Sequence, residues 1–345
     1  MPHDPNILIF GAGSIGNHMT YACTKLGYKV HITDKNFLAL KRMKQIIYPK
    51  RYGKWDKNIN QIKFDNLDNL NIYFDLIIIG TPPNTHLELL KKCKKILRYK
   101  KILIEKPLST YLENFQKLKN EKNLFCGYNH SISPSFQKFL HLIEKEKINK
   151  KTFITIKWQE SFKGILGAHF WLKDEYDSYL GDVKKGGGAI HEHSHGLHLA
   201  VYLLKHLKIK KYSINSNIFF KEKKKKPSYD VMSIIKITGK KINLILETDL
   251  LEDKPVKKVT FYNSEKKITW HNSFSKNLDN INYQKNNYTK NFNFKKNRSY
   301  EFEKEIKHIF DLKNQKQYIE SPLNINYSIE VMRIINKVLK NAKNL

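Results

Sequence analysis

A short apolar run followed at once by closely spaced glycines constrains the fold of this chain more than any other feature. Residues 6–10 read NILIF, which is typical of a buried parallel strand, and GAGSIG follows at 11–16. A helical stretch from about 17 to 26 comes next, Gly27 ends it, and YKVHITD (28–34) reads as a second strand. This order predicts a βαβ unit at the start of a parallel sheet.

The alternation of strands and helices continues to about residue 128 and then changes. Residues 74–80, 86–97, 101–106, 112–122 and 124–128 read in turn as strand, helix, strand, helix and strand. After a helix at 135–147 and a strand within 151–162, strands at 229–238, 241–250, 256–263 and 266–272 follow without helices between them. We expect a long surface loop at 272–298 and two closing helices at 300–313 and 326–343. The pattern predicts an α/β domain at 1–128 and an α+β domain with a mainly antiparallel sheet at 129–345.

The net charge of +31 requires an explanation, because a large positive charge is typical of nucleic-acid binding. Nearly all of the basic residues are lysine, whereas proteins that read phosphates and bases favour arginine. The lysines occur together with many asparagines and isoleucines, a combination that AT-rich codon usage produces. We therefore interpret the charge as a solvated lysine surface and expect no nucleic-acid partner.

Apolar runs and cysteines indicate the compartment. No apolar stretch approaches the roughly 20 residues that cross a bilayer, so we expect no membrane association. The three cysteines form no Cys-x-x-Cys pair, which excludes a zinc knuckle or a disulfide framework. Both observations favour a cytoplasmic protein.

The glycine turn predicts a dinucleotide site. Its glycines (Gly11, Gly13 and Gly16) let the backbone approach a pyrophosphate, Ser14 and Ile15 between them are further candidate contacts, and the N-terminus of the following helix offers free amide groups. Asp34 ends the next strand, where its carboxylate can accept hydrogen bonds from a ribose hydroxyl and repel a 2′-phosphate. The sequence thus predicts NAD, while the neighbouring Lys35 keeps NADP possible.

Two further motifs follow strands at their carboxyl ends, where open α/β sheets bind ligands. The first is GTPPNTH (80–86), which offers Thr81, Pro82, Asn84 and His86 as cofactor contacts. The second is EKP (105–107), in which Glu105 and Lys106 precede a proline that is a candidate for a cis peptide bond. Both motifs are predicted to lie beside the dinucleotide.

A histidine-rich segment, GGGAIHEHSHGLH (186–198), is open to three interpretations: a metal site, acid–base catalysis or structural histidines. On a helix running from 189 to about 206, His191, His195 and His198 share one stripe, Glu192 precedes His195 by three residues, and His193 points to the surface. No third ligand signature accompanies the i,i+4 pair, so we expect no metal. A histidine beside a carboxylate suits proton transfer near neutrality, which favours His195.

Taken together, GAGSIG, TPPNTH, EKPL, GYN (127–129) and the Gly-Gly-Gly entry into an acidic, histidine-bearing helix resemble the glucose–fructose oxidoreductase / inositol dehydrogenase / rhizopine-catabolism (Gfo/Idh/MocA) family. The resemblance implies a Rossmann domain followed by a domain whose open sheet faces a partner subunit, as a homodimer or homotetramer. It also implies that Lys106 hydrogen-bonds the reacting oxygen, that a histidine of the helix exchanges the proton, and that Glu192 supports that histidine.

The chain departs from the family's usual pattern at several positions. Gly196 occupies the usual histidine position, and the resemblance to a variant subgroup moves the catalytic role to His195. Ser131 and Ile132 replace an Arg-Phe pair, which puts the substrate in doubt. Candidate substrate contacts are Tyr128, Asn129, Trp171, Tyr179, His191 and His198.

These observations predict an NAD(P)-dependent oxidoreductase acting on a secondary alcohol or ketone of a sugar or nucleotide sugar, in a pathway such as surface-polysaccharide synthesis. A cyclitol dehydrogenase is the alternative within the enzyme class. A non-catalytic sugar or nucleotide sensor with the same fold is the alternative outside it.

Overall fold

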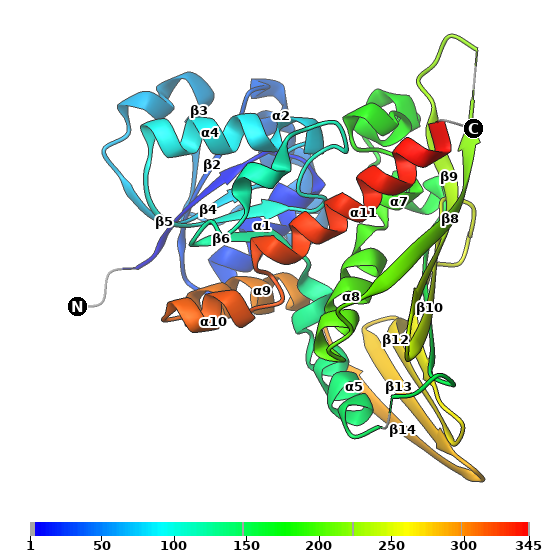
Figure 1. Cartoon of the computed structure of the whole chain (residues 1–345). Helices are drawn as coiled ribbons and strands as arrows, with labels where there is room; N and C mark the ends of the chain where they lie inside the picture. Colours follow the sequence, from blue (N-terminus) through cyan, green and yellow to red (C-terminus); the bar gives the residue numbers. More distant parts are fainter. Residues whose placement is uncertain (1–3, 147, 223, 298, 344–345) are drawn as a thin grey trace. The chain divides into compact units, whose positions relative to one another are not determined.

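The computed structural model describes residues 4–146, 148–222, 224–297 and 299–343. The chain forms two compact units (Figure 1). Unit 1 contains residues 1–109, 114–129 and 299–326, and unit 2 contains residues 110–113, 130–298 and 327–345. The segment 299–326 therefore returns to the first unit after the second has been traversed. The division into two domains after residue 128, which the sequence predicts, stays a prediction.

Unit 1 is built on a parallel six-stranded sheet in the order β3-β2-β1-β4-β5-β6. From β1 the chain adds β2 and β3 on one side of the sheet, and it then adds β4, β5 and β6 on the other side of β1, as in dinucleotide-binding sheets. This confirms the parallel α/β fold predicted for the N-terminal region. The strands are β1 (Asn6–Phe10), β2 (Lys29–Asp34), β3 (Ile59–Lys63), β4 (Tyr73–Ile79), β5 (Arg98–Glu105) and β6 (Leu124–Gly127).

The helices of unit 1 lie between these strands in the sequence, except for α9 and α10, which come from its C-terminal segment. They are α1 (Ser14–Lys25), α2 (Phe37–Arg42), the π-helical turn Met43–Ile47, α3 (Tyr48–Tyr52), α4 (His86–Ile96), α9 (Tyr300–Asp311) and α10 (Gln315–Glu320). The last helix, α11 (Ile325–Lys343), begins in unit 1 and continues into unit 2.

The core of unit 1 forms around its central strands, because their apolar runs have no polar face. Ile7, Leu8 and Ile9 of β1 are fully buried, as are Ile77 and Ile78 of β4. Burying both faces of such strands is what a parallel sheet between helices requires. The three cysteines are buried in this unit as free thiols.

The C-terminal segment of unit 1 completes its packing. Helix α9 packs against α1, and the amide of Cys126 in β6 donates to the Leu323 carbonyl over 2.9 Å. A bridge between Phe125 and Asn324 extends this contact. Residues from both ends of the sequence therefore build one core.

Unit 2 is built on an eight-stranded sheet in the order β14-β13-β12-β11-β7-β10-β9-β8. Its pairs are antiparallel except β7 with β10, which confirms the mainly antiparallel sheet that the sequence predicts. The strands are β7 (Phe153–Gln159), β8 (Tyr212–Lys221), β9 (Tyr229–Gly239), β10 (Ile242–Asp249), β11 (Val256–Tyr262), β12 (Lys266–Ser275), β13 (Leu278–Lys285) and β14 (Tyr288–Lys295).

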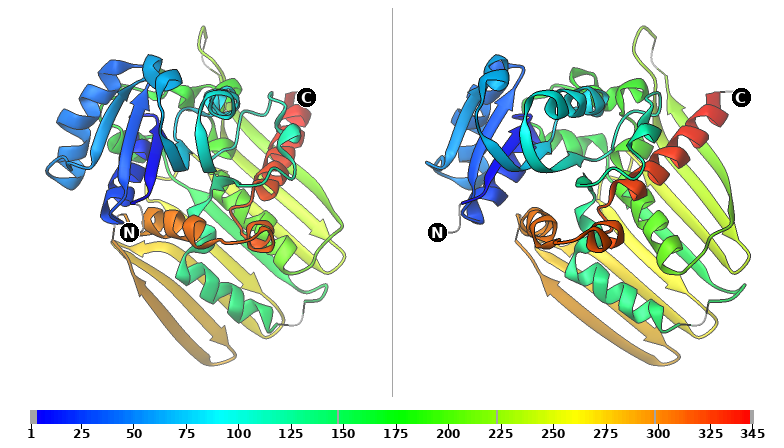
Figure 2. Two further views of the ribbon diagram at one scale, coloured as in Figure 1. Left: turned by 90° about the vertical axis from the view of Figure 1, so that its left-hand side faces the viewer. Right: turned by 60° about the vertical axis from the view of Figure 1, so that its left-hand side comes forward.

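Helices pack on one face of this sheet. They are α5 (Pro134–Glu144), which contacts β12 to β14, and α7 (Ala189–Glu192) and α8 (Ser194–His206), which contact the central strands (Figures 1 and 2). A further short helix, α6 (Phe162–Ala168), follows β7. Ile156 and Trp158 of β7 point into the packed face and are buried, whereas Lys157 between them forms an ion pair of 2.6 Å with Glu247 on the opposite face. This alternation gives the sheet one apolar and one polar side.

Two predicted segments have a different structure. The predicted helix 112–122 contains only a 3₁₀ turn, Phe115–Leu118, and Asn120 and Asn123 have φ of 64° and 61°. Left-handed residues interrupt a helix, which explains the error. The predicted loop 272–298 is also wrong, because β12 extends to Ser275 and β13 and β14 follow as a hairpin. The final residues of the predicted segments 135–147 and 272–298 lie outside the described residues.

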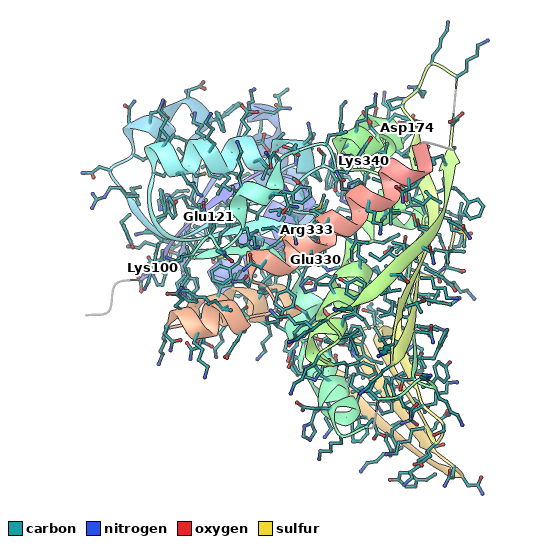
Figure 3. All side chains as sticks on the ribbon, viewed as in Figure 1. Lys100, Glu121, Asp174, Glu330, Arg333 and Lys340 are labelled. Atoms are coloured by element: carbon teal, nitrogen blue, oxygen red, sulfur yellow. The ribbon has the colours of Figure 1, made fainter. Side chains whose placement is uncertain are left out.

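Lysines account for the charge, and many of them project from the surface. Lys100 in β5 and Lys340 in α11 are exposed (Figure 3), and Arg333 of α11 pairs with Glu330 over 3.2 Å. Side chains of this kind interact mainly with water. Within the described part of the chain, no helix combines the length and apolar character needed to span a membrane.

Candidate active site

The turn after β1 contains three glycines with different structural roles. Gly11 has φ of 102°, and a Cβ there would lie 2.5 Å from the Gly80 carbonyl oxygen. A Cβ on Gly16 would lie 1.8 Å from the Gly11 oxygen, so a side chain would force α1 away from the turn. At Gly13, which precedes α1, a Cβ would meet nothing within 4 Å, and no side chain caps the helix. This leaves space and amide donors for the pyrophosphate of a dinucleotide.

Asp34 is fixed at the end of β2 by two backbone amides. One carboxylate oxygen accepts from the Ala12 amide over 2.8 Å, and the other accepts from the Asn36 amide over 2.7 Å. Each oxygen keeps a second lone pair for a hydroxyl group. The carboxylate is therefore held against the glycine turn, where a ribose would bind, and Lys35 beside it is exposed.

Arg51 is a candidate cofactor residue that the sequence motifs did not reveal. Its Nη1 donates to the Ser14 hydroxyl over 3.0 Å, which places a guanidinium beside the first residue of α1. Stacking of Tyr21 on Tyr52, with centroids 3.8 Å apart, connects α1 with the helix that carries Arg51. A cation at this helix terminus adds to the attraction for phosphate. The segment between β2 and β3 contains no motif, so only the fold brings Arg51 here.

The TPPNTH loop is held to the EKP segment by His86. One ring nitrogen of this fully buried histidine lies 3.0 Å from the Pro107 carbonyl oxygen and the other lies 2.7 Å from the Thr81 carbonyl oxygen. Burial lowers the pKa of His86, although the backbone hydrogen bonds partly oppose this. His86 thus joins the two loops, while Pro82 and Asn84 are exposed and Thr81 is half-buried.

The EKP segment ends β5 with a buried acid beside a half-buried lysine. The Lys106–Pro107 bond is cis, as the sequence suggested. Burial raises the pKa of Glu105 to about 7, although the charge of Lys106 opposes this. A Cβ on Gly127 would lie 2.7 Å from a Glu105 oxygen, so the neighbouring strand needs a glycine to admit this carboxyl group.

A second buried acid, Glu305 on α9, interacts with Glu105. Glu305 is fully buried, and neither of its carboxyl oxygens has a hydrogen-bond partner among the described residues. Burial raises its pKa well above the usual value, and the charge of Glu105 raises it further. Because two ionised carboxylates close together repel each other, the state in which both are charged is disfavoured. This pair therefore destabilises unit 1 at neutral pH.

We expect Glu305→Gln to stabilise the protein at pH 8 by about 1 to 3 kcal/mol, with the gain disappearing toward pH 4. The pKa of Glu305 is raised by folding. The unfolded chain therefore loses its proton first as the pH rises above about 4.3, and the stability of the wild type falls. Glutamine has the same shape and cannot ionise. Urea unfolding at several pH values measures the difference, with Glu320→Gln on the exposed face of α10 as the control. An equal effect at pH 4 and pH 8 would contradict this account.

In unit 2 the histidine-rich segment begins at a glycine that contacts a buried acid. Gly188 has φ of 87°, and a Cβ there would lie 2.0 Å from a carboxyl oxygen of Asp230. The other oxygen of Asp230 accepts from the Ile190 amide over 2.8 Å, and burial raises the pKa of this acid to about 6. Asp230 therefore binds the first turn of α7 and fixes where the helix starts.

The segment is not one continuous helix, because α7 ends at Glu192 and α8 starts at Ser194. The break turns His193 inward. This corrects the prediction of a surface histidine: His193 is 3% exposed and its Nε2 lies 3.3 Å from the Glu160 carbonyl oxygen. His191 and His198 are also buried, whereas His195 is half-buried. The four histidines therefore differ in their access to solvent.

His191 is in an environment that keeps it neutral. Its Nδ1 lies 3.0 Å from the Gly187 carbonyl oxygen, and burial lowers its pKa to about 4. A group with such a pKa does not accept protons near neutrality. His198 lies among Tyr202 and Tyr327, with centroid separations of 6.4 and 6.0 Å.

His195 lies against two aromatic rings. Its ring is 4.5 Å from that of His130 in a T-shaped contact and 5.9 Å from that of Trp158. The next residue, Gly196, faces the sheet: a Cβ there would lie 2.9 Å from Leu246 and 3.0 Å from Trp158. Position 196 therefore has no room for a histidine, and His195 is the half-buried imidazole of the first turn of α8.

The remaining candidates occupy varied environments. Glu192 is half-buried and accepts from the Tyr179 hydroxyl over 3.4 Å. Trp171 packs edge-on against His169 and Phe170 at 5.3 and 5.2 Å. In unit 1, Tyr128 and Asn129 are buried. Among the described residues, no group of three or more His, Cys, Asp or Glu side chains is arranged to hold a metal ion.

A parallel sheet in this strand order, with a glycine turn and an acid at the end of β2, defines a dinucleotide-binding Rossmann domain. Residues 6–123 match the model of the GFO_IDH_MocA oxidoreductase family with its NAD-binding Rossmann fold, so this part of the chain is similar to that family of NAD(P)-dependent oxidoreductases. The resemblance seen in the sequence is thereby confirmed, as are the prediction of an enzyme and that of a nicotinamide cofactor. No curated protein matches the sequence.

Several solved structures share the fold over nearly the whole chain. KijD10, a 3-ketoreductase from Actinomadura kijaniata solved with NADP and TDP-benzene, is 10% identical, with a TM-score of 0.72 and 98% of each chain covered. An aldose-aldose oxidoreductase from Caulobacter crescentus is 12% identical, with a TM-score of 0.72 and coverage of 99% of this chain and 98% of that one. The UDP-N-acetylglucosamine 3-dehydrogenase GnnA from Acidithiobacillus ferrooxidans is 13% identical, with a TM-score of 0.68 and coverage of 97% and 96%.

Proposed function

We propose that this enzyme transfers a hydride between a nicotinamide cofactor and a secondary alcohol or ketone carbon of a sugar or nucleotide sugar. The observation that carries the proposal is the glycine turn with Asp34 bonded to the Ala12 amide, which fits a dinucleotide, in a chain that also offers Lys106 and His195. When bound, the cofactor supplies the hydride acceptor or donor. The side chains of the protein then have to manage the charge and the proton of the substrate oxygen.

Lys106 and His195 divide that task. The ammonium of Lys106, next to the end of β5, donates a hydrogen bond to the reacting oxygen and stabilises the negative charge that develops there. The imidazole of His195 takes the proton of the hydroxyl during oxidation and returns it during reduction. The burial of His191, His193 and His198 and the absence of a side chain at Gly196 support His195 as the proton-exchanging residue.

Glu192 acts as the acidic support of His195 in this proposal. It precedes the helix break, and Tyr179 donates to its carboxylate over 3.4 Å. Tyr179 and Trp171 belong to the aromatic segment before the glycines, and we propose them as contacts for a sugar ring. Tyr128, Asn129, His191 and His198 stay predicted substrate contacts.

A nucleotide sugar is the substrate class we favour. KijD10 is described as a 3-ketoreductase in complex with a TDP derivative, and GnnA as a UDP-N-acetylglucosamine 3-dehydrogenase. The many exposed lysines also attract an anionic substrate. A cyclitol, and a role as a sensor without turnover, are the alternatives.

A substrate screen tests the function. The purified protein is incubated with UDP-N-acetylglucosamine, a TDP-hexose, free aldoses and myo-inositol, each with NAD⁺ and with NADP⁺, and the absorbance of the reduced cofactor is followed. We expect turnover with a nucleotide sugar. Turnover with myo-inositol alone would favour the cyclitol alternative. Binding of the cofactor without turnover of any compound would favour the sensor.

Asp34 provides a test of cofactor preference. We expect Asp34→Ser to shift the ratio of the Kd values for NADH and NADPH by at least about tenfold toward NADPH, because the repulsion of a 2′-phosphate is removed. Titration of nicotinamide fluorescence measures both Kd values. Asp75→Ser is the control. Asp75 also accepts from a backbone amide, that of Asn6, but Asn6 lies at the start of β1, whereas the glycine turn follows the end of that strand. An unchanged ratio in Asp34→Ser would refute a role of this carboxylate in discrimination.

Assembly and location stay predictions. We propose a homodimer or homotetramer formed through the polar face of the large sheet, which no described helix of unit 2 covers. Size-exclusion chromatography with light scattering tests this. A cytoplasmic location and a role in surface-polysaccharide synthesis likewise stay part of the proposal.

A further inference from the structure

The ring of His195 contacts a second histidine that no sequence motif pointed to. His130 follows the GYN motif in the 3₁₀ turn Asn129–Ile132, and its own carbonyl accepts from the Ser133 hydroxyl over 2.9 Å. The rings of His130 and His195 are 4.5 Å apart with planes at 68°, and Trp158 contacts both, at 5.0 and 5.9 Å. The orientation of the His195 ring is therefore limited on two sides by aromatic rings.

An amide group fixes the tautomer of His130. The Nδ1 of His130 lies 3.3 Å from the Nδ2 of Asn272 on β12. Because an amide nitrogen only donates, Nδ1 has to accept, and the proton of the neutral ring is on Nε2. The amide itself is oriented by its neighbours: its nitrogen also faces Asp279 over 3.5 Å, and its oxygen accepts from the Ser273 hydroxyl over 3.3 Å.

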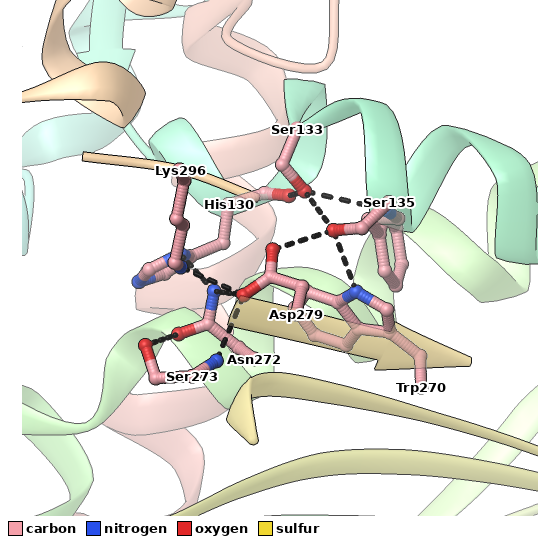
Figure 4. Close-up of polar contacts among 9 residues, drawn as sticks. His130, Ser133, Ser135, Trp270, Asn272, Ser273, Asp279 and Lys296 are labelled. Atoms are coloured by element: carbon pink, nitrogen blue, oxygen red, sulfur yellow. Dashed lines mark hydrogen bonds and ion pairs between the residues drawn. The ribbon is translucent and has the colours of Figure 1, made fainter. Parts of the chain in front are cut away.

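Asp279 on β13 anchors this arrangement (Figure 4). Its carboxylate pairs with Lys296 over 2.8 Å, and the two side chains are only 4% and 10% exposed. It also accepts from the Ser273 amide over 2.8 Å and from the Ser135 hydroxyl over 2.7 Å. Ser135 in turn accepts from the Trp270 indole over 2.9 Å. A buried ion pair with this many partners is a rigid support for the amide.

We propose that His130 is a positioning residue for His195, and that Asn272, held by the Asp279–Lys296 ion pair, keeps the His130 ring in place. Polar contacts thus run from Lys296 through Asp279 and Asn272 to His130, and a T-shaped ring contact continues from His130 to the imidazole of His195. This inference rests on the proposed function only in giving His195 its catalytic role. The contact itself is a property of the folded protein.

A double-mutant cycle tests the connection. With UDP-N-acetylglucosamine and NAD⁺ as the probe, or the best substrate of the screen, we expect Asn272→Leu and His130→Phe each to lower kcat about five- to tenfold with KM within about twofold. Because Asn272 acts only through His130, Asn272→Leu has no further effect in the His130→Phe background. An equal additional loss in that background would overturn the proposal, as would an unchanged kcat in either single variant.

A second measurement does not depend on turnover. The ¹⁵N signals of the imidazoles in the full-length protein report the tautomers of His130 and His195. We expect His130 to show the Nε2–H form in the wild type and a mixture in Asn272→Leu, together with a shift of the His195 signals. The matched control is Asn282→Leu on β13, whose amide bonds to Asn291 on the exposed hairpin and which should leave both histidines unchanged.

The two measurements separate the two ideas. If the tautomers change as expected but no substrate is turned over, the positioning contact is supported and the proposed function is refuted. Turnover combined with unchanged His195 signals in Asn272→Leu would support the function and refute the positioning role. Denaturant unfolding of each variant identifies any that fails to fold, and in that case Asn272→Ser replaces Asn272→Leu as a smaller change.

Discussion

Replacing Lys106 with methionine is expected to lower kcat/KM by about three orders of magnitude while the Kd for NADH stays within about threefold of the wild-type value. The methionine side chain keeps most of the length of lysine and loses only the ammonium. A hydrogen bond from a charged donor to a developing oxyanion stabilises the transition state more than the bound substrate, so turnover suffers and cofactor binding does not.

Lys100→Met is the matched control, because Lys100 lies on β5, the strand that Lys106 follows, and has an exposed side chain (Figure 3). Initial rates with the best substrate of the screen and fluorescence titration with NADH measure the two quantities. Retention of more than a tenth of the wild-type kcat/KM in Lys106→Met would show that another group polarises the substrate.

Gly188→Ala is expected to destabilise the protein by at least about 3 kcal/mol. The added Cβ would lie 2.0 Å from a carboxyl oxygen of Asp230, at a position where φ is 87°. Relief of that clash requires moving either the start of α7 or a fully buried acid that binds the Ile190 amide. Since α7 leads directly into the segment that carries His195, we also expect activity to be lost.

Gly167→Ala is the control for this substitution, because a Cβ at Gly167 in α6 meets nothing within 4 Å and alanine favours a helix. Urea unfolding followed by tryptophan fluorescence gives both values. A loss below about 1 kcal/mol in Gly188→Ala would show that the surroundings of Asp230 adapt to the methyl group.

The Rossmann strands could be predicted from the sequence because their signals are local. Runs such as NILIF and DLIIIG are apolar without interruption, and glycines and prolines mark their ends. Strand β3 was missed because INQIK is short and only one of its residues, Ile59, is buried. Its position at the edge of the sheet explains why its composition resembles that of a loop.

The hairpin of β13 and β14 was missed because asparagine and lysine are rare in strands. Here the asparagines satisfy one another across the strands: Asn280 bonds to Asn293 over 2.8 Å, and Asn282 to Asn291 over 2.9 Å. Asn277 in the turn before β13 and Asn286 in the turn between β13 and β14 have φ of 61° and 50°, as tight hairpin turns require. The signal was therefore present in the turns rather than in the strands.

The candidate site was only partly accessible to sequence reasoning. Motifs locate Asp34 at the end of one strand and Lys106 directly after another. Helical spacing placed His195 on one stripe with His191 and His198, and the choice of His195 rested on Glu192 and on the resemblance to the variant subgroup. At the break, His193 contacts the carbonyl of Glu160, which lies 33 residues away, and no local pattern indicates this contact. The contacts of Arg51 with Ser14 and of His130 with Asn272 likewise join distant residues, so only the fold brings them together.

The return of residues 299–326 to unit 1 has a consequence for synthesis on the ribosome. The amide of Cys126 bonds to Leu323, and α1 packs against α9, which is translated much later. A nascent chain therefore exposes an unfinished apolar surface while almost two hundred further residues are made. Translation speed and chaperone access during that interval should influence the yield of native enzyme more than for a chain whose first domain folds by itself.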